Sequence, residues 1–117
     1  MSTLREDAKY IYTRAIEAVL PDEAVRRALA GQNFPGRVIL VAAGKAAWRM
    51  ASAAKAALGE RIETGIVITK YGHVQGPVPG ILCREAGHPV PDENSFSATR
   101  EALSLTENLT ADDTVLF

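Results

Sequence analysis

Residues 37–50, "RVILVAAGKAAWRM", join a continuous apolar run to an alanine-rich run through a single Gly44-Lys45 pair. The apolar run is rich in β-branched residues and is bounded by glycines, which is typical of a strand buried on both faces. The alanine-rich run predicts a helix to about Leu58 that packs closely on a sheet, and Gly59 is well placed to end it. A buried strand that leads directly into a helix predicts an α/β protein.

The rest of the chain continues this alternation of strands and helices. Further strands are predicted at 64–70, 81–86 and 112–117, and helices at 2–20, 22–30 and 94–109. The order ααβαββαβ predicts an open, mostly parallel sheet with helices on both faces, a Rossmann-like arrangement in three layers. The first helix carries apolar residues at i, i+4, i+7 and i+11, so we expect it to bury one face. The sequence stops as its last strand begins, which predicts a truncated domain.

Composition excludes several classes of function. The net charge is −1 and the aromatic share is 6%, so the chain has neither the basic surface nor the stacking residues expected of a nucleic-acid-binding protein. No apolar run reaches the ~18 residues of a membrane span. The charged residues 5–7 do not fit a signal peptide, and the single cysteine, Cys83, fits a reducing compartment. We therefore expect a cytoplasmic protein that binds neither nucleic acid nor membranes.

Three unusual stretches follow predicted strands: Gly44-Lys45, "KYGH" at 70–73 and "GHP" at 87–89. In open α/β sheets, ligands bind beyond the carboxyl ends of the strands. At the start of a helix, backbone amides and the Lys45 ammonium would face the same point, which suits a phosphate or carboxylate. The alternatives are a surface lysine, a solvated loop at 70–73, and a stiff loop after 86 whose Asp92, Asn94 or Ser95 caps the next helix.

Three other chemistries lack their residue patterns. A P-loop would need Gly at 39 and Ser or Thr at 46, where the chain has Ile39 and Ala46. The turn after the first strand has one glycine where a dinucleotide-binding fingerprint has three. His73, His88 and Cys83 lack metal-ligand spacing, so no metal site is predicted from them.

Three segments carry a family resemblance: "VAAGKAAWRMA", "GIVITKYGH" and "EAGHPVPDENS". In this order and spacing they resemble the N-terminal domain of the MOFRL-type, or class II, glycerate 2-kinases, which are often labelled hydroxypyruvate reductases. The resemblance covers essentially the whole chain. It implies that residues 1–117 are the N-terminal part of that α/β domain, and that the C-terminal domain of the family is absent here.

The resemblance also implies an activity. The full-length enzyme would transfer the γ-phosphoryl group of ATP to D-glycerate, with Mg²⁺, giving 2-phosphoglycerate, whereas the 117-residue chain alone would be inactive. Lys45 matches the family's lysine at the start of the helix after the first strand and is the candidate catalytic residue. The candidate substrate-binding residues are Gly44, Lys45, Lys70, His73 and His88. Asp112 and Asp113 precede the last strand, at the wrong end of the sheet for this site.

Two other functions stay open on the sequence. One is an NAD(P)H-dependent hydroxypyruvate reductase, against which the missing glycine fingerprint counts. The other is an anion-binding α/β module without catalytic activity.

Overall fold

The computed structural model describes all residues from 1 to 117 and contains the elements that the sequence predicts, in the predicted order. The helices are α1 (Leu4–Ala18), α2 (Pro21–Leu29), α3 (Ala47–Leu58) and α4 (Glu93–Leu105), with a short 3₁₀ turn at Gly59–Arg61. The strands are β1 (Val38–Ala43), β2 (Ile62–Lys70), β3 (Ile81–Ala86) and β4 (Thr114–Leu116).

The four strands form one sheet in the order β3-β2-β1-β4, and every neighbouring pair is parallel. The direction of the third strand, which the sequence leaves open, is therefore parallel too. In the middle of β2, an added Cβ on Gly65 would lie 2.6 Å from the carbonyl oxygen of Leu40 in β1. Glycine at this position is thus required by the close approach of two strands.

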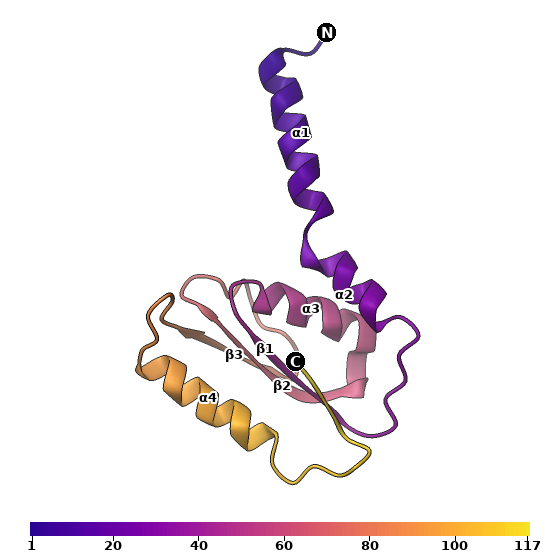
Figure 1. Cartoon of the computed structure of the whole chain (residues 1–117), viewed down its shortest axis with the longest axis vertical. Helices are drawn as coiled ribbons and strands as arrows, with labels where there is room; N and C mark the ends of the chain where they lie inside the picture. The colour runs from indigo at the N-terminus through magenta and orange to yellow at the C-terminus, as the bar shows by residue number, and fades with distance from the viewer.

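Helices cover both faces of the sheet, with α3 on one side and α4 on the other (Figure 1). On the α3 side, Ala47, Ala51 and Ala54 of that helix are buried in one cluster with Leu40 and Val67 of the sheet. On the other side, α4 buries Ala98. These layers confirm the predicted three-layer α/β fold.

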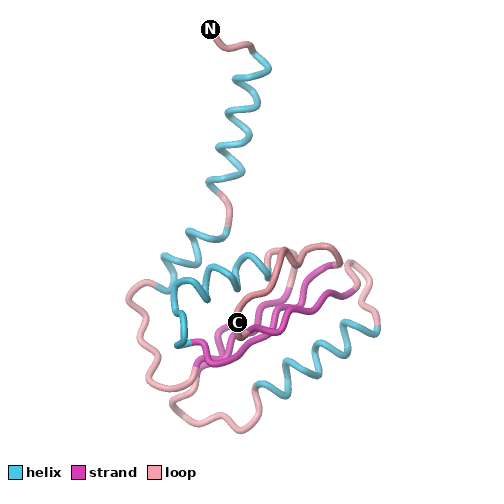
Figure 2. The backbone as a smooth tube through the Cα atoms, turned by 180° about the vertical axis from the view of Figure 1, so that it is seen from behind, coloured by secondary structure: helices cyan, strands magenta, loops and turns pink.

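The first helix departs from the prediction. A capping box of Thr3 and Glu6 starts α1, but none of its residues is buried, and the expected buried face is wrong. Ile11, in the middle of the apolar stripe, is 66% exposed. The helix points away from the sheet, and only α2 returns to pack beside α3 (Figure 2). Apolar residues at helical spacing therefore predict a helix with an apolar face, but they do not determine whether another part of the chain packs against that face.

The last helix ends earlier than predicted, at Leu105 rather than Leu109. The chain must reverse there to reach β4, and Asn108 adopts a left-handed conformation with φ of 56°. No helix of the structure has the length and apolar character needed to cross a membrane.

Candidate functional site

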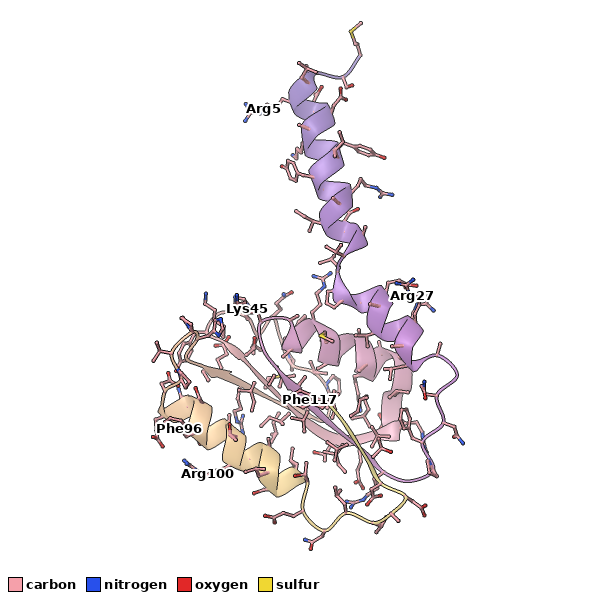
Figure 3. All side chains as sticks on the ribbon, in the orientation of Figure 1. Arg5, Arg27, Lys45, Phe96, Arg100 and Phe117 are labelled. Atoms are coloured by element: carbon pink, nitrogen blue, oxygen red, sulfur yellow. The ribbon has the colours of Figure 1, made fainter.

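The loops after β1, β2 and β3 meet at one edge of the sheet. Because the three strands are parallel, their carboxyl ends lie together, and each is followed by one of the stretches singled out in the sequence. Figure 3 shows Lys45 at this edge. The prediction that these loops converge is therefore confirmed.

Lys45 lies just before α3 rather than in its first turn, because the helix begins only at Ala47. Gly44 has a φ of 124°, and its amide still donates to the carbonyl oxygen of Ile68 in β2, at 3.0 Å. This combination turns the chain from the strand into the helix and leaves Lys45 exposed. The backbone amides of Lys45, Ala46, Trp48 and Arg49 have no backbone acceptor.

A pocket of about 230 Å³, which we call the edge pocket, opens between the starts of α3 and α4. Its lining consists of Ala43, Gly44, Lys45, Ile68, Thr69, Lys70, Ala86, Gly87, His88, Pro91 and Ser95. Four of the five predicted site residues are in this list. No carboxylate side chain is in it, whereas two lysines are.

His73, the fifth predicted site residue, lies on the other side of Lys45. Its Nδ1 is 3.3 Å from the carbonyl oxygen of Lys45, and because a carbonyl only accepts, this hydrogen bond places the proton on Nδ1. His73 lines a second pocket of about 400 Å³, which we call the helix pocket. Its lining consists of Leu20, Pro21, Lys45, Ala46, Trp48, Arg49, Gly72, His73 and Gln75. Lys45 is the one residue common to both pockets.

Sequence reasoning missed Tyr71, which ties two of the loops together. Its hydroxyl donates to Oδ2 of Asp92 at 2.6 Å and accepts from the Asn94 side-chain amide at 2.8 Å. The Tyr71 hydrogen bond, supported by backbone amides, lowers the pKa of Asp92 to about 2, and the same contact raises the pKa of Tyr71. The tyrosine follows Lys70 in "TKYGH", but nothing local to that motif points to Asp92.

Asp92 also caps α4, as the sequence allows, by accepting from the Ser95 amide at 3.2 Å. The loop before it is tight, because an added Cβ on Gly87 would lie 2.5 Å from the carbonyl oxygen of Val90. Together, the cap and the Tyr71 hydrogen bond fix the loop that carries His88 relative to the loop that carries Lys70.

The residues at this edge do not fit a magnesium ion. Mg²⁺ prefers carboxylate and other oxygen ligands, yet no carboxylate lines either pocket, and no group of three or more His, Cys, Asp and Glu side chains is arranged to hold a metal. Asp113 lies at the opposite end of the sheet, where it accepts from Arg37 Nη2 at 2.8 Å. This guanidinium holds the pKa of Asp113 well below its usual range.

An apolar pocket of about 310 Å³ lies beside β1, between α2, α3 and β4. All of its lining residues are hydrophobic, from Val25 in α2 to Phe117 at the end of the chain. It offers no polar group to orient a hydroxy acid or phosphate. A polar pocket of about 490 Å³ at the opposite end of the sheet contains Arg37 and Asp113, and none of the loops after β1, β2 and β3 lines it.

Several known proteins are similar to this chain in sequence. The chain is 53% identical over 115 residues to D-glycerate 2-kinase of Thermotoga maritima, covering 98% of this chain and 27% of that protein. It is 36% identical over 123 residues to Glycerate 2-kinase of Pyrococcus horikoshii, covering 96% and 27%. A relative from Agrobacterium vitis, 38% identical over 112 residues, carries the name of a hydroxypyruvate reductase and is covered to 25%. The chain thus spans about a quarter of the length of these relatives.

Solved structures show the same fold. The crystal structure of Glycerate kinase from Thermotoga maritima matches with a TM-score of 0.87 and 54% identity, over 97% of this chain and 27% of that one. A crystal structure from Pyrococcus horikoshii matches with a TM-score of 0.79 and 33% identity, over 98% and 28%. The resemblance seen in the three sequence segments is confirmed. Residues 7–117 match the family described as Domain of unknown function (DUF4147), and the chain belongs to that family.

Proposed function

We propose that the whole protein is a cytoplasmic D-glycerate 2-kinase with ATP as phosphoryl donor, and that residues 1–117 are the N-terminal part of its N-terminal domain. In this proposal Lys45 is the catalytic residue, and Gly44, Lys70, His73 and His88 contribute to substrate binding. The names of the Thermotoga and Pyrococcus relatives support the reaction. We assign no magnesium ligand to this chain, because its residues at the site do not fit that ion.

The observation that carries the proposal is the convergence of cations in the edge pocket. Lys45 and Lys70 come from two different strand ends and line one pocket that has no carboxylate. Glycerate carries one carboxylate, which two ammonium groups attract, and the neighbouring His88 offers a hydrogen bond to a hydroxyl. The pocket is therefore complementary in charge to a small hydroxy acid.

In this proposal Lys45 acts in phosphoryl transfer. In the proposed reaction the 2-hydroxyl oxygen of glycerate forms a bond to the γ-phosphorus, and the bond from that phosphorus to the β–γ bridging oxygen breaks. The products are 2-phosphoglycerate, ADP and the proton of the hydroxyl. Such transfer depends mainly on positioning and on neutralising charge, and an exposed ammonium on the rim of the acceptor pocket supplies both.

Turnover assays on the purified whole protein, rather than on residues 1–117 alone, test the proposal. ADP formation that requires D-glycerate is the expected result. The name of the Agrobacterium relative makes a reductase the second candidate, so a parallel assay follows NADH and NADPH oxidation with hydroxypyruvate. Reductase turnover without kinase turnover would replace the proposed reaction, and glycerate binding with neither turnover would favour the anion-binding module.

A further inference from the structure

The helix pocket is a second polar cavity beside the edge pocket, on the far side of Lys45. It is the larger of the two, at about 400 Å³ against about 230 Å³. Its walls come from the α1–α2 junction, the start of α3 and the loop after β2. Of the proposed substrate-binding residues, Gly44, Lys70 and His88 are absent from its lining, whereas His73 is part of it. The two pockets therefore share only Lys45.

The side chains of the helix pocket suit an anion with several oxygens. Lys45 and Arg49 are its cationic side chains, and no carboxylate lines it, although Asp22 pairs with Arg49 from outside the lining. Arg49 is held from one side, where its Nε donates to Oδ1 of Asp22 at 2.5 Å. Its two terminal nitrogens donate to no acceptor in the protein. A guanidinium that is fixed through Nε and open at both terminal nitrogens is prepared to donate two parallel hydrogen bonds.

Backbone donors reinforce these charges. Ala46, Trp48 and Arg49 line the pocket, and the amides of all three lack a backbone acceptor at the start of the twelve-residue helix α3. Unpaired amides and the positive end of a helix dipole favour the same anion as the side-chain cations do. Trp48 is held in place by a hydrogen bond from Nε1 to the carbonyl oxygen of Gly76 at 2.8 Å. The Arg49 guanidinium and the backbone amides are therefore held in place by the protein, whereas the exposed Lys45 side chain is free to move.

We propose that the helix pocket binds a phosphoryl group, so that Lys45 stands between a hydroxy-acid subsite and a phosphoryl subsite. The role of this second subsite in phosphoryl transfer rests on the proposed kinase function. The arrangement of its donors does not depend on that function. A phosphoryl oxygen would accept from Arg49 and from the amides of α3, while the Lys45 ammonium reaches both ligands. The donated group and its acceptor would thus meet at one lysine.

Gln75 offers a test that leaves the donors intact. It is exposed, lines only the helix pocket, and makes no hydrogen bond through its side chain that would be lost on substitution. Gln75→Glu adds a negative charge of nearly the same shape and is expected to weaken tripolyphosphate binding about tenfold at low salt. Gln75→Lys is expected to strengthen it. Neither variant is expected to change the affinity for D-glycerate more than about twofold.

Gln32→Glu is the matched control, because it makes the same change in the exposed turn before β1. Isothermal titration of the purified protein with tripolyphosphate, orthophosphate and D-glycerate gives the readout. Tighter binding of tripolyphosphate than of orthophosphate identifies a nucleotide tail as the source of the group, and equal binding identifies a single phosphate. Either result supports the subsite when Gln75→Glu weakens the binding of the phosphate compound and Gln32→Glu does not.

Two outcomes overturn the inference. One is no phosphate binding by a protein that binds glycerate, and the other is an equal effect of the two glutamate variants. Failure of the proposed function gives a different result. The protein would then neither bind nor phosphorylate glycerate, but Gln75→Glu would still weaken its binding of tripolyphosphate.

Discussion

The hydroxyl of Tyr71 donates a 2.6 Å hydrogen bond to Oδ2 of Asp92, and this contact joins the loop after β2 to the loop after β3. Lys70 precedes the tyrosine, and His88 lies four residues before the aspartate. The strand ends themselves are held by the pairing of β2 with β3, which reaches Lys70 and Ala86. The loops beyond them are joined by a contact outside the lining of the edge pocket.

Tyr71→Phe is expected to loosen the edge pocket without unfolding the protein, because Tyr71 is exposed and only its hydroxyl is lost. We expect the KM for glycerate to rise several-fold, with a smaller change in kcat, and the pKa of Asp92 to rise from about 2 toward 3.8. Steady-state kinetics and NMR titration of the Asp92 carboxyl measure the two effects. Tyr12→Phe, on exposed α1, is the control, and equal kinetics in both variants would contradict the positioning role of Tyr71.

Asp92 predicts an acid limb in the stability of the protein. Its folded pKa of about 2 lies below the ordinary value of 3.8, so the unfolded chain binds more protons between these values. The stabilisation is complete above about pH 4 and is lost as the pH falls through about 2. Urea unfolding of the wild type and Asp92→Asn should show a difference in unfolding free energy that shrinks across this window. A difference that stays constant from pH 6 to pH 2 would be inconsistent with the lowered pKa.

Lys45→Ala is expected to lower kcat/KM for glycerate phosphorylation by one or more orders of magnitude, each factor of ten being about 1.4 kcal/mol. The lysine is exposed, so the loss reflects the site rather than the fold. Lys9→Ala on α1 removes the same exposed charge far from both pockets and serves as the control. Unchanged kcat/KM in Lys45→Ala would remove this lysine from the site.

Gly65→Ala is expected to destabilise the sheet by about 1–3 kcal/mol, because the new methyl group would overlap Leu40 in the neighbouring strand. Gly31→Ala is a useful comparison. Gly31 has a φ of 75° with nothing within 4 Å of the added atom, so only backbone strain opposes that substitution. Thermal unfolding should show a larger loss of stability for Gly65→Ala than for Gly31→Ala. If Gly65→Ala lost less stability than Gly31→Ala, this would argue against the close approach of β1 and β2.

The strands and their common edge could be predicted because each depends on local signals. The β-branched run before Gly44 and the alanines after it define one strand and the helix on it, and the same pattern recurs at 64–70. Parallel topology then places the three loops together. Four of the residues that the sequence singles out line the edge pocket for this reason, and their role in substrate binding stays a prediction.

The remaining features depend on contacts between distant residues, which periodicity does not encode. Tyr71 and Asp92 are far apart in sequence and meet only because two loops fold toward each other. Arg49 is held through Nε by Asp22, which lies in a different helix. The exposed face of α1 has the same origin, since its apolar stripe says nothing of which surface lies nearby.

Because Lys45 lines both pockets, the two proposed ligands are thermodynamically coupled. Two anions that share one cation oppose each other, so occupancy of either pocket should lower the affinity of the other. Reciprocity requires the same factor in both directions, whichever ligand binds first. Through Lys45, each proposed ligand would thus bind more weakly in the presence of the other, although the same side chain brings the two close enough to react.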